Sequence, residues 1–263
     1  MFSGSSYHTP ANKKRGFWAF LLRGNRHNFY MRSGWILGRA GIRSRLGLLS
    51  PACQIKYSNK IFRLLESCGA KFHIEGLDNL KALEGGEPVV LMGNHMSMLE
   101  TSLFHCMLRP YTDFTYVIKE DLLTVPFFGH IMRALEAIPV GRTNPREDLK
   151  TLMREGQARI NRGTSIIIFP QGTRNQEFRK EDFNSIGFKL ARHTGVRVLP
   201  FALCTDFIGI NGFDKLNPDN PIRFEFFPVM TVEGNGSAEH KLVTDMIADK
   251  LAQWRQGKNN DCK

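Results

Sequence analysis

The stretch Pro88-Val-Val-Leu-Met-Gly-Asn-His-Met-Ser-Met-Leu-Glu100 decides the fold. Its apolar half, 88–92, is short and bounded, which is typical of a strand buried on both faces. A polar loop with His95 follows, and Ser97 lies three residues before Glu100, which is the pattern of a helix N-terminus. The stretch therefore predicts a strand that ends and a helix that begins around a histidine and a carboxylate.

Strand and helix patterns alternate from about residue 70 to the end of the chain. We expect an α/β fold with a mixed, largely parallel sheet flanked by helices, because consecutive βαβ units produce this alternation. This domain would cover 69–263, and a basic amphipathic helical region over 1–68 would precede it. The predicted strands are 71–75, 88–92, 114–118, 137–140, 165–169, 196–203 and 222–229, and the predicted helices are 96–108, 126–135, 145–161, 185–193 and 237–256.

A second polar run, Phe169-Pro-Gln-Gly-Thr-Arg-Asn175, follows the apolar strand predicted over 165–169. Ligands of open parallel sheets bind at the carboxyl ends of the strands, so we expect both polar runs at one edge. A histidine held by a carboxylate takes protons from hydroxyls near neutral pH, and His95 with Glu100 suits this task. The alternative is that Ser97 and Glu100 only cap a helix and that His95 has no chemical role.

The net charge of +11 is concentrated at the N-terminus. Residues 1–65 carry 12 Lys or Arg and no Asp or Glu, whereas the rest of the chain carries 24 basic and 25 acidic residues. Apolar residues such as Phe17, Trp18, Phe29 and Trp35 are interleaved with these charges. Basic and aromatic side chains together favour the surface of an anionic membrane. A basic arm that binds nucleic acid is the alternative, but the interleaved apolar residues favour lipid.

The composition excludes several classes of protein and of site. With 42% hydrophobic and 23% charged residues, the chain is an ordinary globular protein rather than a disordered one. It has no apolar stretch of the roughly 18 residues that a spanning helix needs, and residues 1–10 lack the apolar core of a signal peptide. The five cysteines are scattered without a CxxC pair, so we expect reduced thiols and no metal site.

The chain resembles the glycerolipid acyltransferase family, and the lysophosphatidic acid acyltransferases in particular. The resemblance covers roughly residues 71–205, and it is carried by four blocks in the family's order and by one segment between the first two. These are Asn94-His95-x4-Glu100, Ile138-Pro-Val-Gly-Arg142, Phe169-Pro-x-Gly-Thr-Arg174, Val198-Leu-Pro-Phe-Ala-Leu203 and the segment 119–129.

The resemblance implies a reaction without metal or cofactor. His95, held by Glu100, would deprotonate the free hydroxyl of a lysophospholipid, which would attack the thioester of acyl-CoA or acyl-carrier protein with no acyl-enzyme. The rate would rise with pH through the imidazole pKa, and backbone N–H groups near Gly172 would stabilise the oxyanion. The acceptor phosphate is expected at Arg174, Thr173, Gly172, Arg142 and Lys119, and further substrate contacts at Gln171 and Asn94.

Two positions depart from the family's pattern. Glu100 stands where Asp is usual, and its extra methylene changes the reach toward His95. Gln171 stands where Glu is usual, and a neutral amide beside the phosphate should alter acceptor recognition. We expect 1-acylglycerol-3-phosphate as the acceptor, phosphatidic acid as the product, and a peripheral location on the cytoplasmic face of the inner membrane. The alternatives are lysophosphatidylglycerol, a lyso-ornithine lipid, or a lipid- or nucleic-acid-binding protein without catalysis.

Overall fold

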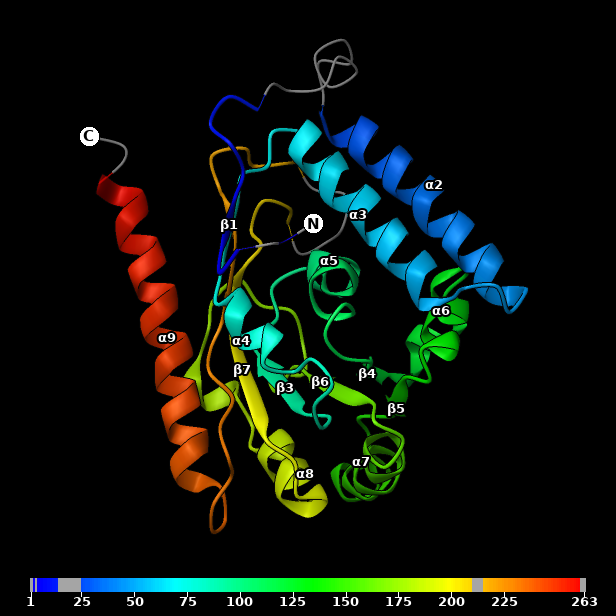
Figure 1. Ribbon diagram of the computed structural model, residues 1–263, viewed down its shortest axis with the longest axis vertical. Helices are drawn as coiled ribbons and strands as arrows, with labels where there is room; N and C mark the ends of the chain where they lie inside the picture. The colour runs from blue at the N-terminus through cyan, green and yellow to red at the C-terminus, as the bar shows by residue number, and fades with distance from the viewer. Residues whose placement is uncertain (1, 3, 14–24, 210–214, 261–263) are drawn as a thin grey trace.

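The computed structural model of the chain describes residues 2, 4–13, 25–209 and 215–260. Phe17 and Trp18 of the predicted basic and aromatic region lie outside these described residues. One eight-stranded sheet has helices on both faces (Figure 1). Its strands are β1 Tyr7–His8, β2 Phe72–Glu75, β3 Val90–Gly93, β4 Phe114–Lys119, β5 Ile138–Val140, β6 Ser165–Ile168, β7 Val198–Cys204 and β8 Ile222–Phe226. The helices are α2 Asn25–Arg45, α3 Pro51–Ser67, α4 Leu77–Lys81, α5 Leu99–Leu108, α6 Phe128–Ala134, α7 Pro145–Ile160, α8 Ile186–Thr194 and α9 Ser237–Asn260, with short 3-10 turns at Glu120–Thr124 and Lys180–Asp182.

The strand order β1-β2-β8-β7-β3-β6-β4-β5 confirms the predicted fold class. The five strands β7, β3, β6, β4 and β5 are parallel to one another. In contrast, β8 pairs antiparallel with β7, and β1 pairs antiparallel with β2. Because parallel strands end at the same edge, the loops after β3, β4, β5, β6 and β7 emerge side by side.

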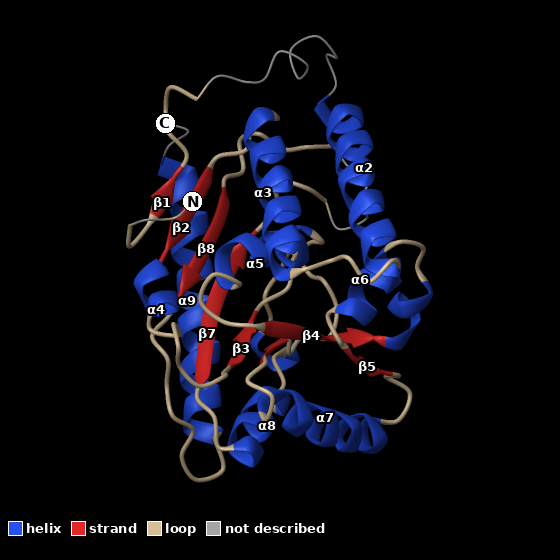
Figure 2. Cartoon of the chain, turned by 45° about the vertical axis from the view of Figure 1, so that its right-hand side comes forward, coloured by secondary structure: helices blue, strands red, loops and turns tan. Residues whose placement is uncertain are grey.

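The central strands are buried on both faces by two separate cores. In β3, Leu91 lies in the core that contains apolar side chains of α3 and α5. Its neighbours Val90 and Met92 lie in the core that contains side chains of α7, α8 and α9. This alternation is the two-residue period of a strand, and Figure 2 shows α3 and α5 on one side of the sheet and α7 and α8 on the other.

Close packing at the end of β3 requires a glycine. A Cβ on Gly93 would lie 2.2 Å from the ring of Phe201 in the neighbouring strand β7. Gly93 therefore lets β3 and β7 come together immediately before the loop that carries His95.

Several element ends differ from the sequence prediction. The strand predicted over 222–229 ends at Phe226, and Pro228 has no N–H with which to extend the ladder. The helix predicted from residue 96 begins at Leu99. Strand β1 was not predicted, and it pairs Tyr7 with Ile74, so the sheet includes residues from the region expected to be helical.

Helices α2 and α3 lie side by side and cover α5 and α6 (Figures 1 and 2). Pro51 at the first turn of α3 and Ser50 before it mark the start of that helix, since the Ser50 hydroxyl accepts a hydrogen bond from the Cys53 N–H. Within the described residues, no helix combines the length and hydropathy required to cross a membrane.

Candidate active site

A cleft of about 620 Å³ opens at the carboxyl edge of the parallel strands. Apolar side chains such as Val117, Ile168 and Phe169 line part of it, and the rest is polar or basic. The sequence prediction named nine site residues, and six of them line this cleft: His95, Lys119, Arg142, Gly172, Thr173 and Arg174.

His95 follows the end of β3 in sequence, and its ring is held by stacking on another aromatic ring. Its ring lies 4.1 Å from the ring of Phe169, centroid to centroid, with 18° between the planes. Its side chain is 18% exposed, so one edge of the imidazole reaches the cleft while the rest is buried. Phe169 belongs to the second polar run, so the two runs meet in this ring pair.

Glu100 lies beneath His95 and is fully buried. Its Oε1 accepts hydrogen bonds from the N–H groups of Met96 and Ser97 at 3.0 and 2.7 Å and from the Thr205 hydroxyl at 2.7 Å. Its Oε2 lies 3.7 Å from Nδ1 of His95, and that nitrogen has no hydrogen-bond partner within the described part of the chain. Oε2 also accepts a longer hydrogen bond, 3.4 Å, from the Ser97 hydroxyl, so the carboxylate is anchored mainly by Oε1 while Oε2 lies toward the imidazole.

The two groups have strongly shifted pKa values. Burial raises the pKa of Glu100 to about 7, against the opposing effect of its hydrogen bonds from Thr205 and the backbone. Burial, together with the guanidinium groups of Arg174 and Arg142, lowers the pKa of His95 to about 3. At neutral pH the imidazole is therefore uncharged and able to accept a proton, and the carboxylate is the group that titrates.

The activity of this site should rise with pH through about 7. Below that pH Glu100 is protonated and cannot stabilise an imidazolium; above it the carboxylate can, while His95 is neutral throughout. The sequence pattern predicts this rise at the pKa of the imidazole. Because burial raises the pKa of Glu100 and lowers that of His95, we expect the rise at the pKa of the carboxyl group. A profile of kcat/KM from pH 5 to 9 checks the prediction, and a flat profile across about 7 would contradict it.

The loop over 169–175 is tied to the loop of His95 by its backbone. Oε1 of Gln171 accepts the His95 N–H at 2.9 Å, and the Asn175 N–H donates to the His95 carbonyl at 2.9 Å. Gln171 therefore braces the histidine loop through Oε1 and is not among the residues that line the cleft, and its role as a substrate contact stays a prediction. A glutamate at this position would accept the same bond, so the brace does not require the amide.

Gly172 makes the turn in this loop. Its φ of 71° lies in the left-handed region that favours glycine. Its N–H donates to the carbonyl of Phe169 at 3.0 Å, so it closes the turn and does not point at a developing oxyanion. Backbone donors for the oxyanion, which the sequence predicts near Gly172, would therefore have to be N–H groups other than that of Gly172.

Three basic side chains face the cleft from different strands. Arg142 follows β5 with a φ of 62°, and the carboxylate of Asp148 holds this turn by accepting the N–H groups of Gly141 and Arg142 at 2.9 and 2.8 Å. Arg174 follows β6, and Lys119 ends β4 and forms an ion pair with Asp121. These cations give the cleft a positive wall, and two of them, Arg174 and Arg142, are close enough to His95 to lower its pKa.

Asn94 follows β3 and bonds to the neighbouring strand β7. Its amide accepts the Leu203 N–H and donates to the Leu203 carbonyl, both at 2.8 Å, and the side chain is 1% exposed. Both of its polar ends are engaged in joining the ends of β3 and β7. Asn94 therefore holds the sheet edge together, and its contact with substrate stays a prediction.

Sequence reasoning missed Thr205. It follows β7 at the same edge, and its hydroxyl bonds Glu100 at 2.7 Å and lies 2.8 Å from the Ser97 hydroxyl. A polar residue two positions after the fourth block was the available signal, because every other strand end of this edge carries a site residue. Among the described residues, no group of three or more His, Cys, Asp or Glu side chains is placed to hold a metal ion.

The chain is similar in sequence to known acyltransferases. The Acyltransferase family profile matches residues 71–204. A 1-acyl-sn-glycerol-3-phosphate acyltransferase of Pseudomonas aeruginosa is 33% identical over 134 residues, which are 51% of this chain and 49% of that protein. A protein of the same name from Borreliella burgdorferi is 27% identical over 195 residues, 70% of this chain and 72% of that one. The chain spans about half the length of the first of these relatives.

The fold has a solved counterpart. The crystal structure of the 1-acyl-sn-glycerophosphate (LPA) acyltransferase, PlsC, from Thermotoga maritima superposes with a TM-score of 0.63 at 18% sequence identity. The superposition covers 90% of this chain and 93% of that one. The two chains therefore share their architecture, including the region before residue 69.

Proposed function

Because the chain belongs to the acyltransferase family, we propose that its cleft transfers a fatty acyl group from a thioester donor to the free hydroxyl of a lysophospholipid. One observation carries the proposal: His95 has one nitrogen directed at a buried carboxylate and shares its cleft with three basic side chains. The pair supplies a base for a hydroxyl, and the cations supply a seat for a phosphate.

The proposed reaction is a direct transfer. Nε2 of His95 takes the hydroxyl proton while the hydroxyl oxygen bonds to the thioester carbonyl carbon. The resulting tetrahedral oxyanion collapses, the carbon–sulfur bond breaks, and the thiolate leaves with the proton from the imidazolium. During this step Nδ1–H donates to Oε2 of Glu100, which requires the 3.7 Å separation to shorten to hydrogen-bond length.

We propose 1-acylglycerol-3-phosphate as the acceptor, with acyl-CoA or acyl-carrier protein as the donor. Arg174 offers a planar fork that suits a phosphate monoester, with Arg142 and Lys119 beside it. Both bacterial relatives are named as 1-acyl-sn-glycerol-3-phosphate acyltransferases, which supports the same acceptor. Lysophosphatidylglycerol and a lyso-ornithine lipid are the other acceptors to compare, because the first carries a less charged phosphate and the second none.

An acceptor panel with one labelled acyl-CoA tests this choice. We expect 1-acylglycerol-3-phosphate to be the best acceptor and Arg174→Ala to raise its KM about tenfold to a hundredfold, as the loss of a charge-assisted hydrogen bond implies. Arg179→Ala, a change of another exposed arginine nearby in sequence, is the matched control and should leave KM unaltered. A better rate with the phosphate-free lyso-ornithine lipid, or an unchanged KM in Arg174→Ala, would reject the phosphate assignment.

We also propose that α2 and the rim segment 122–127 rest on the cytoplasmic surface of an anionic membrane. Along α2, Met31, Trp35 and Ile42 are exposed at 77%, 68% and 52%, at helical spacing on one face. Phe127 is 48% exposed and lines the same surface groove as Trp35. Arginines such as Arg39 and Arg43 border this groove and suit anionic head groups.

Vesicle flotation tests the membrane proposal. We expect binding to vesicles that contain phosphatidylglycerol, weakened about tenfold or more in the double variant Trp35→Ala/Phe127→Ala, since two large side chains lose their burial in lipid. Leu242→Ala, which removes an exposed apolar side chain of α9, is the control. Binding to duplex DNA but not to such vesicles would contradict the proposal.

A further inference from the structure

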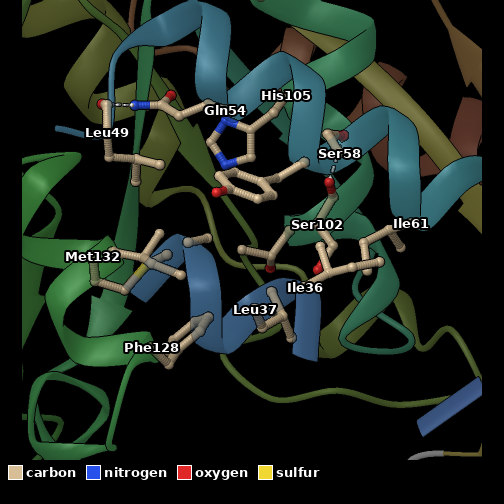
Figure 3. A pocket seen from close by; sticks show the side chains of 14 residues that line it. Ile36, Leu37, Leu49, Gln54, Ser58, Ile61, Ser102, His105, Phe128 and Met132 are labelled. Carbon is tan, nitrogen blue, oxygen red and sulfur yellow. Dashed lines mark hydrogen bonds between the residues drawn. The ribbon is translucent and has the colours of Figure 1, made fainter. Parts of the chain in front are cut away.

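A second, smaller cavity lies behind the cleft, enclosed by α2, α3, α5 and α6 (Figure 3). It holds about 50 Å³ of free space. Thr101 and Phe128 belong to the walls of both the cavity and the cleft, so these two spaces adjoin. Thr101 near the start of α5 and His105 farther along it both line the cavity, so the cavity extends along α5 from the side of the cleft.

The walls of the cavity differ in polarity. Leu37, Phe128 and Met132 form the lower wall in Figure 3 and come from α2 and α6. The upper wall comes from α3 and α5 and includes Gln54 and His105. A purely apolar space would suit a hydrocarbon chain alone, whereas this one also has polar side chains in its walls, Gln54 and His105 among them.

Gln54 presents an unused acceptor. Its Nε2 donates to the Leu49 carbonyl at 3.3 Å, which fixes the orientation of the amide. Its Oε1 is buried and has no hydrogen-bond partner among the described residues, and the whole residue is 7% exposed. Buried amide oxygens are rarely left in this condition.

His105 presents an unused ring nitrogen. The residue is 8% exposed, and its Nδ1 finds no partner in the described part of the chain. Burial lowers the pKa of His105 to about 3, and the charge of Arg109 lowers it further, so the imidazole is neutral. A neutral imidazole offers one N–H donor and one acceptor, and it does not call for an anion.

Ser58 lies in the same wall, and its hydroxyl, in contrast, has hydrogen-bond partners within the protein. Its hydroxyl bonds the carbonyl of Ser102 at 2.6 Å and accepts the Cys106 N–H at 3.0 Å, so it ties α3 to α5. Gln54 Oε1 and His105 Nδ1, on two residues of the same lining, have no such partner among the described residues. Leucine and phenylalanine of similar shape would remove the desolvation cost of both atoms.

We propose that this cavity receives a short hydroxyl-bearing segment of the hydrocarbon chain of a lipid substrate and that Gln54 and His105 bind the hydroxyl group. The proposal rests on the proposed function, because it takes the chain to be that of the acyl donor or of the lysolipid. A hydroxyl both donates and accepts, so it matches an amide oxygen and a neutral imidazole. A charged group would lack a counter-charge in this cavity and would be costly to bury.

The position of His105 sets where the hydroxyl lies. Glu100 and His105 are five residues apart on α5, which is a rise of about 7.5 Å. The hydroxyl therefore belongs several carbons along the chain and not beside the reacting carbonyl. The adjacent walls at Thr101 and Phe128 leave the intervening carbons in apolar surroundings.

Two assays test the proposal and identify the source of the chain. In the first, transfer rates are compared for palmitoyl-CoA and mid-chain hydroxypalmitoyl-CoA with one plain acceptor, and then for plain and mid-chain hydroxylated 1-acylglycerol-3-phosphate with palmitoyl-CoA. In the second, binding of free palmitic and mid-chain hydroxypalmitic acid to the purified chain is measured by calorimetry, so a catalytically silent preparation still gives an answer.

The double variant Gln54→Leu/His105→Phe is compared with the parent in both assays. We expect the parent to prefer the hydroxylated chain about tenfold or more, on the donor arm or on the acceptor arm, and the variant to lose this preference while using the plain chain at least as well. Asn59→Leu is the matched control, because it removes another unpartnered buried oxygen from α3 outside the cavity.

Equal use and equal binding of plain and hydroxylated chains by the parent would overturn the proposal and leave a buried water as the occupant. Retention of a hydroxyl preference by the double variant would overturn it as well. If no lysolipid is acylated but hydroxypalmitic acid still binds about tenfold more tightly than palmitic acid, the proposed function fails and the hydroxyl site stands.

Discussion

Replacing Glu100 with Gln should lower kcat/KM at pH 8 by about 10³-fold or more. The amide oxygen of Gln can keep the hydrogen bonds from Met96 and Ser97 that now reach Oε1. Its NH₂ group then faces Nδ1 of His95 and donates to it, which places the ring proton on Nε2 and removes the base. In serine proteases the corresponding carboxylate-to-amide change lowers kcat by about 10⁴.

The same substitution should make the protein more stable above pH 7. Glu100 has a pKa raised from 4.5 to about 7 in the folded protein, so the folded state binds a proton more tightly than the unfolded state. Its cost to stability is absent below about 4.5, grows as the pH rises, and is complete above about 7. Gln carries no charge, so the melting temperature at pH 8 should rise by roughly 5 °C.

Glu66→Gln is the matched control for this pair of effects. Glu66 is 3% exposed and accepts side-chain bonds from Tyr7, Thr9 and Lys13, far from the cleft. Its replacement should lower stability, because Lys13 loses its partner, and leave kcat/KM unchanged. A Glu100→Gln protein that keeps its activity, or that melts at a lower temperature than the parent at pH 8, would show that Glu100 is merely structural.

His95→Ala should lower kcat by about 10³- to 10⁴-fold, which is the usual contribution of a general base at its upper end. The fold should survive, because Nδ1 of His95 has no hydrogen-bond partner within the described residues and the ring packs mainly on Phe169. Added imidazole should restore part of the rate, since the missing ring leaves room beside Phe169 and opens to the cleft.

His73→Ala serves as the control, because His73 lies on β2 away from the cleft and its loss should leave kcat unaltered. Melting curves of both variants separate lost chemistry from lost folding. An His95→Ala protein with full transferase activity would remove His95 from the mechanism.

The architecture could be predicted from the sequence because its signals are local and redundant. Short apolar runs such as 88–92 and 165–169 each precede a polar run, and parallel strands bring those runs to one edge. The family resemblance is confirmed by the match over 71–204. Strand β1 escaped prediction because two residues, Tyr7–His8, are too few to show a period.

The finer placement of the site depends on side-chain direction, which spacing does not encode. Asn94 and His95 are neighbours in sequence, yet one joins β3 to β7 and the other faces the cleft. Thr205 and Glu100 are 105 residues apart and meet only because β7 lies beside β3. The sequence pattern predicts that the imidazole sets the pH dependence, whereas the pKa values in the folded chain assign it to Glu100. Burial, a property of the folded chain, causes this difference.

Acceptor-dependent release of thiol tests the central claim most directly. Purified protein is mixed with labelled acyl-CoA, and free CoA and labelled lipid are followed with and without 1-acylglycerol-3-phosphate. A direct transfer predicts that CoA appears only with the acceptor present, in equal amount to labelled phosphatidic acid and with no label on the protein. Release of CoA at the same rate without any acceptor, or transfer to no lysophospholipid at all, would contradict the account.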